Sequence, residues 1–257
     1  MNNLERYREQ IDRLDAVSLL RWSAETFTPG SIVLASSLGA EDQVLTHMIA
    51  SEHLPIGVFT LDTGRLFQES YDLIHATRER LGIGIDLFFP QAEAVESMVR
   101  ERGPNLFYDS VADRKRCCHV RKVEPLFRAL AGKEIWITGQ RREQSPTRAA
   151  LSPLEWDETQ GIYKLNPLCE WSHDQVWEYV RGNDVPYNLL HDRGFPSIGC
   201  APCTRAVREG EDERSGRWWW ESPDHKECGL HIAGDTTSSS PAPMAGMFGK
   251  LGPDSQD

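Results

Sequence analysis

Residues Ser31-Ile-Val-Leu-Ala-Ser-Ser-Leu-Gly-Ala-Glu-Asp42 join a short apolar run to a loop of small residues, and Val44, Leu45 and Met48 follow at helical spacing. The pattern predicts a strand over 31–36, a turn and then a helix. Such a unit presents backbone N–H groups and the positive end of a helix to an anion. Ser36 and Ser37 would add hydroxyl donors. Alone this is weak evidence, because many such turns bind nothing.

The same unit recurs along the chain. Apolar strands are predicted over 56–61, 85–90 and 134–139, with helices through Tyr71 and Ile74 and near 92–102. Alternating strands and helices predict an α/β fold with a mostly parallel sheet covered on both faces. Ligands of such sheets bind at the carboxyl ends of the strands. Three of these ends carry polar or small-residue loops, at 36–42, 62–65 and 139–148, which indicates one phosphate-binding crevice.

The flanking segments are less regular. Apolar spacing predicts an amphipathic N-terminal helix over 4–24, and Tyr163-Lys-Leu165 a short edge strand. Ser172-His-Asp-Gln175 has the form of a helix N-cap. A Gly/Pro-rich loop follows over 183–202, and the Gly/Ser/Thr/Pro-rich residues 232–257 are expected to be a disordered tail. We therefore expect one catalytic domain over 1–231.

Composition limits the partners. The 257 residues are 39% hydrophobic and 26% charged, with no apolar run of membrane-spanning length and no apolar signal segment at the N-terminus. We expect a cytoplasmic protein that binds no membrane. The net charge of −11 argues against nucleic acid. Residues 114–148, however, carry ten Lys and Arg against three Glu, which favours a small polyanion as ligand.

Four of the six cysteines form two pairs, Cys117-Cys118 and Cys200-Ala-Pro-Cys203. The first pair is expected at or near the start of a helix over 114–130. Adjacent cysteines diverge on a helix, so together they serve one small ion poorly and a [4Fe–4S] cluster more easily. Structural zinc and free thiols remain alternatives. Arg121 and Lys122, at i+4 from the pair, would offset cluster charge or hold an anion, unless they form a solvated face. Cys169 is expected to be a packed thiol.

Lys226-Glu-Cys-Gly-Leu-His231 is unlike core sequence. We interpret Cys228 as a nucleophile on a mobile C-terminal arm over 210–231. A buried structural thiol is the alternative.

Together, these motifs resemble the assimilatory adenylyl-sulfate (APS) reductases, close relatives of the phosphoadenylyl-sulfate (PAPS) reductases. The resemblance covers nearly the whole chain. It implies an adenine-nucleotide α-hydrolase-like, Rossmann-like sheet, and Cys228 as nucleophile. It also implies one [4Fe–4S] cluster per subunit on Cys117, Cys118, Cys200 and Cys203. The implied ligands of the sulfate are Lys122, Arg214 and Arg217. The other implied substrate-binding residues are Ser36, Ser37, Gly39, Asp42, Asp62, Thr63, Gly64, Arg141, Arg142, Arg148 and His231.

The implied reaction releases AMP and leaves a Cys228 S-sulfonate, from which a second thiol expels sulfite. The chain has no other motif like a resolving dithiol and stops 26 residues after His231. We therefore expect an external reductant, thioredoxin or glutaredoxin; the resemblance also allows a homo-oligomer. Rival interpretations are the same reaction on PAPS, an ATP pyrophosphatase-type tRNA-thiolating enzyme, and a zinc-stabilised binding module. Leu38 and Gln43 depart from the Ser-Gly-Gly-x-Asp-Ser loop of the pyrophosphatases, and the zinc module leaves Cys228 unexplained.

Overall fold

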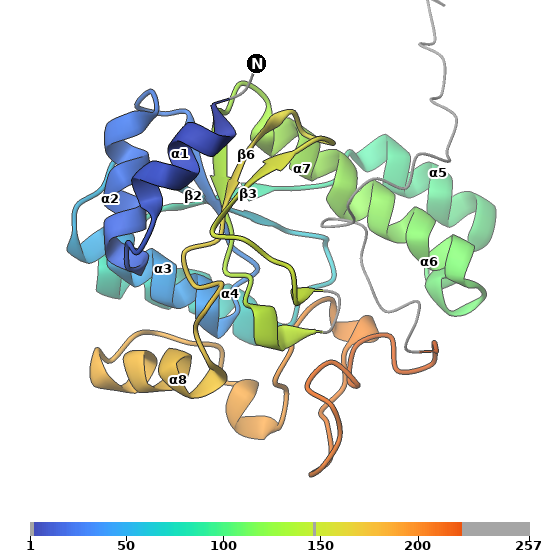
Figure 1. Cartoon of the computed structure of the whole chain (residues 1–257). Helices are drawn as coiled ribbons and strands as arrows, with labels where there is room; N and C mark the ends of the chain where they lie inside the picture. Colours follow the sequence, from blue (N-terminus) through green and yellow to red (C-terminus); the bar gives the residue numbers. More distant parts are fainter. Residues whose placement is uncertain (1–2, 146–147, 223–257) are drawn as a thin grey trace, which may run out of the picture.

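The computed structural model describes residues 3–145 and 148–222, and these form a six-stranded sheet (Figure 1). The strand order is β3-β2-β1-β4-β6-β5. Neighbouring strands are parallel except for β5, which pairs antiparallel with β6. The strands are β1 Ile32–Ala35, β2 Gly57–Leu61, β3 Ile85–Phe88, β4 Ile135–Ile137, β5 Leu154–Asp157 and β6 Ile162–Leu165. The mostly parallel α/β fold expected from the sequence is confirmed.

Helices cover both faces of the sheet (Figure 1). They are α1 Leu4–Ile11, α2 Ala16–Thr26, α3 Ala40–Ser51, α4 Gln68–Leu81, α5 Ala92–Arg102, α6 Val111–Cys118, α7 Glu124–Leu130 and α8 His173–Gly182. Side chains alternate along a strand, so Ile32 and Leu34 of β1 pack with α1, α2, α3 and α8. Val33 packs on the opposite face with Leu126 and Leu130 of α7. Both faces of β1 are therefore buried, which explains its continuous apolar run.

The order of the strands places a topological switch next to β1. The chain runs from β1 outward to β2 and β3, then crosses back to β4 on the other side of β1. The loops after β1 and β4 therefore diverge and leave a crevice at the carboxyl ends of these strands, where α/β sheets bind ligands. Residues 183–222 run across this end of the sheet (Figure 1).

Two sequence predictions about the sheet and its flank are wrong. The N-terminal helix expected over 4–24 is two helices, because Asp15 caps α2 by accepting a hydrogen bond from Ser18 N at 2.8 Å. Apolar spacing continues through the break, so periodicity alone did not reveal it. The segment Tyr163–Leu165 is not an edge strand. It belongs to β6, which lies between β4 and β5, and β5 is the edge strand on this side of the sheet.

The predicted cysteine helix over 114–130 also differs. It begins at Val111, because Ser110 Oγ accepts a hydrogen bond from Asp113 N at 3.0 Å. Cys117 and Cys118 therefore lie at the end of α6 and not near a helix start. A π turn, His119–Val123, follows and joins α6 to α7. Such wide turns are frequent at functional sites.

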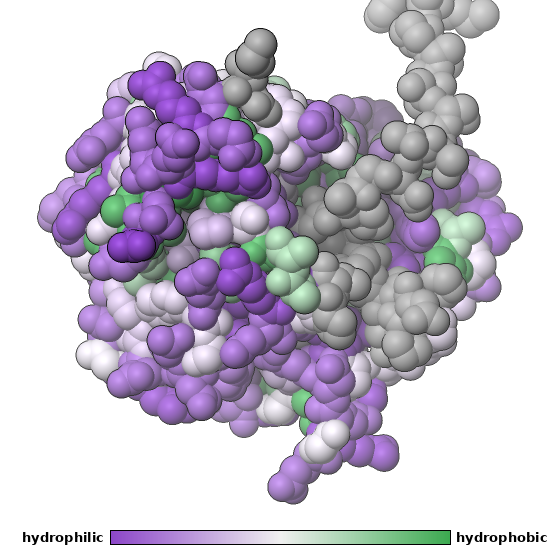
Figure 2. Space-filling model, in the orientation of Figure 1, coloured by the Kyte–Doolittle hydropathy of each residue, from purple (hydrophilic) through white to green (hydrophobic). Residues whose placement is uncertain are grey.

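The surface shown in Figure 2 is largely hydrophilic, with small scattered apolar patches. In the described residues, no helix combines the length and the apolar character needed to cross a bilayer. The expected N-cap at Ser172 is confirmed, because Ser172 Oγ accepts from Gln175 N at 3.1 Å.

Candidate active site

A cavity of about 230 Å³ opens at the switch point between β1 and β4. Its walls come from the loops after β1, β2 and β4, from the π turn and α7, and from residues 191–218. The predicted residues that line it are Ser36, Ser37, Gly39, Asp42, Thr63, Lys122, Arg148, Cys200, Arg214 and Arg217. The convergence of three strand ends on one crevice is thus confirmed.

Asp42 fastens the loop after β1 to the loop after β4. Its carboxylate accepts hydrogen bonds from Ser37 N at 2.7 Å, Ser37 Oγ at 2.6 Å and Gly139 N at 3.1 Å. Burial raises the pKa of Asp42 to about 6, although the hydrogen bonds from Ser37 oppose that rise. A side chain at Gly139 would place Cβ 2.4 Å from Asp42 Oδ1, so only glycine fits. Asp42 therefore shapes the cavity with oxygens that are already hydrogen-bonded.

The loop after β2 connects the cavity to the cysteines. Asp62 Oδ1 accepts hydrogen bonds from Gly64 N at 2.7 Å and Tyr71 Oη at 3.0 Å. Neither Asp62 nor Gly64 lines the cavity. Thr63 does, and its Oγ1 lies 3.2 Å from Cys200 Sγ. Asp62 therefore shapes the turn that presents Thr63.

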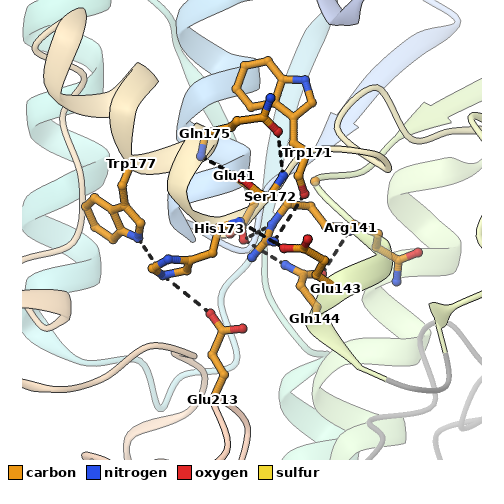
Figure 3. Close-up of polar contacts among 12 residues, drawn as sticks. Glu41, Arg141, Glu143, Gln144, Trp171, Ser172, His173, Gln175, Trp177 and Glu213 are labelled. Atoms are coloured by element: carbon orange, nitrogen blue, oxygen red, sulfur yellow. Dashed lines mark hydrogen bonds and ion pairs between the residues drawn. The ribbon is translucent and has the colours of Figure 1, made fainter.

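The three arginines of the loop after β4 have different partners. Arg141, with a side chain 1% exposed, donates from Nε to Glu41 Oε1 at 2.8 Å (Figure 3). Arg142 donates to Leu151 O at 2.7 Å and to Glu170 Oε1 at 3.1 Å, and it does not line the cavity. Arg148 lines the cavity and donates to Gln144 Oε1. Of these three predicted ligands, only Arg148 faces the cavity, while Arg141 supports it through Glu41.

The four paired cysteines surround one small buried cavity that adjoins the larger one. Each is 8–9% exposed. Lys122, Arg217, Trp218 and Cys200 line both cavities. Burial opposes ionisation of Cys200, but Lys122, the Thr63 hydroxyl and Arg217 outweigh it and lower the pKa of this thiol. Burial raises the pKa of Cys203 to about 12. The two cysteine segments, which have 81 residues between them, are thus brought together as predicted.

The donor set around these thiols fits an anionic iron–sulfur cluster. Among the described residues, no group of three or more His, Cys, Asp or Glu is placed to hold a metal ion. Arg65 Nη1, Arg121 Nε and Trp218 Nε1 are buried and lack a hydrogen-bond partner within residues 3–145 and 148–222. All three residues line the cysteine cavity. N–H groups in this position suit a cluster whose sulfurs accept hydrogen bonds.

Residues 214–221 are held against both cysteine segments. Trp218 N donates to Cys203 O at 3.1 Å. The Trp218 ring contacts the guanidinium groups of Arg114 and Arg217, each 4.8 Å from its ring centroid. Glu221 forms an ion pair with Arg114 in which both side chains are almost fully buried. Because Gly199 lacks a side chain, the Arg217 guanidinium can lie against its backbone. The start of the predicted arm is therefore anchored, and Trp218 is a core residue.

Some predicted features lie outside the described residues. These are Cys228, His231, the arm beyond Ser222 and the tail over 232–257. Cys169 is buried at 2% exposure, as expected for a packed thiol. The sequence did not single out Glu41, His191 and Glu213 as ligands, although all three line the cavity. Glu41 lies within the small-residue loop 36–42 that the sequence predicted, whereas no pattern of residue spacing indicated His191 or Glu213.

The sheet and its switch-point cavity define an adenine-nucleotide α-hydrolase-like protein. The model of the phosphoadenosine phosphosulfate reductase domain matches residues 31–206. A protein from Burkholderia cepacia named adenosine 5′-phosphosulfate reductase is 56% identical over 234 residues, 91% of this chain and 90% of its own. The chain therefore belongs to the phosphoadenosine phosphosulfate reductase family.

Two solved structures agree with this assignment. The phosphoadenylyl-sulfate reductase from Candida auris, in complex with phosphate, is 28% identical with a TM-score of 0.68. The match covers 79% of this chain and 96% of that one. Yeast FAD synthetase in complex with FAD is 17% identical with a TM-score of 0.51, over 80% of this chain and 72% of that one. The second likeness shows the fold alone, which is the one expected from the sequence.

Proposed function

We propose that this protein is an oxidoreductase of sulfate assimilation that reduces APS to sulfite and AMP. The observation that carries the proposal is the placement of Lys122 and Arg217 between the switch-point cavity and four buried cysteines. Cations there suit the phosphosulfate of APS, and the curated relative from Burkholderia cepacia named for this activity aligns over nine-tenths of the chain.

In the proposed mechanism the Cys228 thiolate attacks the sulfur of the phosphosulfate. The bond between that sulfur and the bridging oxygen breaks, AMP leaves with the electron pair, and an S-sulfonate forms on Cys228. Lys122, Arg214 and Arg217 would neutralise the sulfate oxygens that otherwise repel the thiolate. Ser36, Ser37 and the loop amides would hold the phosphate, with Arg148 beside the sugar.

The second half of the reaction requires two electrons from a dithiol, which we assign to reduced thioredoxin or glutaredoxin. One donor thiolate attacks Cys228 Sγ and expels sulfite, leaving a mixed disulfide. The second donor thiol then releases Cys228 and closes the donor disulfide. No electron is needed from any other group. We place this chemistry in the cytoplasm and in one catalytic domain over 1–231.

We also propose that Cys117, Cys118, Cys200 and Cys203 hold one [4Fe–4S] cluster per subunit. When bound, the cluster would tie the two cysteine segments together and set the electrostatic field around Lys122 and Arg217. Arg65, Arg121 and Trp218 would supply N–H groups toward it. Four buried thiols around one cavity support this proposal.

The test compares Cys228→Ser with Cys169→Ser, which alters a buried thiol away from the cavity. Both proteins are purified anaerobically, iron and sulfide are measured, and sulfite release from APS is followed with reduced thioredoxin. We expect no sulfite from Cys228→Ser, unchanged AMP binding, and near wild-type turnover by Cys169→Ser. Full turnover by Cys228→Ser would refute the nucleophile. Colourless protein with stoichiometric zinc would refute the cluster.

A further inference from the structure

Four aromatic side chains form a surface patch beside the cysteine cavity. They come from two segments that are far apart in the sequence and comprise Phe107, Tyr108, Trp219 and Trp220. The Tyr108 ring centroid lies 4.5 Å from those of both Phe107 and Trp220. The Trp219 ring lies 4.7 Å from that of Trp220 and 6.1 Å from that of Tyr108. We call these four residues the aromatic patch.

The aromatic patch is exposed and held in place. Tyr108 and Trp219 are 44% and 40% exposed, whereas Phe107 is 1% exposed and lines the cysteine cavity. Tyr108 Oη donates a hydrogen bond to Pro202 O, within the C-x-x-C turn, at 2.8 Å. Because the polar end of this side chain already has a partner, its ring is the part left for contact. Aromatic side chains fixed in this way lose little conformational freedom when a partner binds.

The aromatic patch lies within reach of the proposed nucleophile. Trp218 N donates to Cys203 O at 3.1 Å, which fixes the backbone next to Trp219. Ser222 follows Trp219 by three positions, and Cys228 follows Ser222 by six. A chain spans at most about 3.5 Å per residue, so Cys228 stays within about 20 Å of Ser222 whatever path the chain takes. A protein that attacks Cys228 Sγ must therefore dock close to this part of the surface.

We propose that the aromatic patch is the docking surface for reduced thioredoxin. This inference rests on the proposed function, in which a donor dithiol attacks Cys228 Sγ. Transient redox complexes bury less than about 1,200 Å², so a small apolar surface is sufficient. Trp and Tyr are also the residue types that most often dominate the binding energy of an interface. A second copy of the chain bound here permanently would hinder access of the donor to Cys228, which favours a transient occupant.

The test measures sulfite release from saturating APS by the holoenzyme as the concentration of reduced thioredoxin is varied. The variants are Trp219→Ala and Tyr108→Ala, and the same proteins are assayed with dithiothreitol, a small dithiol that needs no docking surface. We expect each variant to raise KM for thioredoxin about tenfold and to leave the dithiothreitol-driven rate unchanged. Trp219→Phe, which keeps a ring, should recover most of the loss. Phe127→Ala is the matched control, because Phe127 is 44% exposed on α7 and lies outside the aromatic patch.

Binding of reduced thioredoxin, measured by calorimetry without APS, separates this inference from the proposed reaction. We expect Cys228→Ser to bind as the wild type does and Trp219→Ala to bind about tenfold more weakly. If the wild type releases no sulfite with either donor, the proposed function fails, and calorimetry still decides the inference.

Four results would overturn the docking surface. These are a wild type that does not bind thioredoxin, patch variants with the wild-type KM and affinity for thioredoxin, and an equal increase in KM caused by Phe127→Ala. The fourth is a dithiothreitol-driven rate that falls as far as the thioredoxin-driven one, because the aromatic patch would then support the active site itself. Sedimentation tests the other occupant: an oligomer that Trp219→Ala dissociates without changing KM for thioredoxin would assign the aromatic patch to a second copy of the chain.

Discussion

The buried ion pair between Arg114 and Glu221 joins the cysteine helix to the last described turn of the chain. Arg114 donates from Nε to Glu221 Oε1 at 3.0 Å and from Nη2 to Oε2 at 2.8 Å. The side chains are 1% and 3% exposed. Replacing Glu221 with alanine leaves a buried guanidinium without this carboxylate. Breaking such a pair costs about 3 kcal/mol, which lowers Tm by about 6–12 °C in a protein of this size.

The assay is thermal unfolding of anaerobically purified protein, with iron content measured in parallel. The exposed pair of Arg116 and Glu101, 2.6 Å apart, is the matched control, and Glu101→Ala should cost less than about 1 kcal/mol. The double variant Arg114→Met/Glu221→Leu should recover most of the loss, because no charge then remains buried. The reasoning is refuted if Glu221→Ala lowers Tm no more than Glu101→Ala does. It is also refuted if the double variant lowers Tm by the sum of the decreases caused by Arg114→Met and Glu221→Leu alone.

Two further predictions concern the junction of the loops after β1 and β4. Gly139→Ala places a methyl group 2.4 Å from Asp42 Oδ1, so we expect a loss of about 1–3 kcal/mol and weaker AMP binding by calorimetry. Gly182→Ala, where the added Cβ meets nothing within 4 Å, should leave affinity unchanged; equal effects of the two would contradict the assignment. Since burial raises the pKa of Asp42 to about 6, the folded protein binds this proton more tightly than the unfolded chain does. Its contribution to stability is therefore present at low pH and is lost as pH rises through about 4 to 6. Relative to Asp42→Asn, denaturant unfolding should show the wild type losing about 1 kcal/mol between pH 5 and pH 7; parallel pH profiles would contradict this.

Local sequence signals were sufficient for the sheet and for much of the site. Ser36, Thr63 and Gly139 follow three strands, and parallel strands bring their carboxyl ends to one edge, so their convergence could be predicted. Glu213 and His191 could not be predicted, because their segment has no periodicity. Its position depends on backbone hydrogen bonds to residues far away in the sequence, such as the one from Ala201 N to Arg65 O at 2.8 Å.

The arginines show a second limit of sequence reasoning. Arg141, Arg142 and Arg148 look equivalent in a basic loop, yet only the fold decides which carboxylate each one meets. Arg141 meets Glu41, 100 positions earlier in the chain, while Arg142 meets Glu170. The number of charges therefore predicted the basic segment. It did not predict which arginine would face the cavity and which would support it.

The π turn over His119–Val123 determines the direction in which the side chains of Cys117 and Cys118 point relative to α7. Each residue of an α-helix advances the direction of the side chains by about 100°, so one residue more or fewer between Cys118 and α7 would swing both thiols to another side of the helix. The turn itself carries two cations with different partners: Arg121 Nη1 donates to Thr63 O at 2.6 Å, while the charge of Lys122 lowers the pKa of Cys200. The number of residues in this short segment is therefore as much a determinant of the site as their identity.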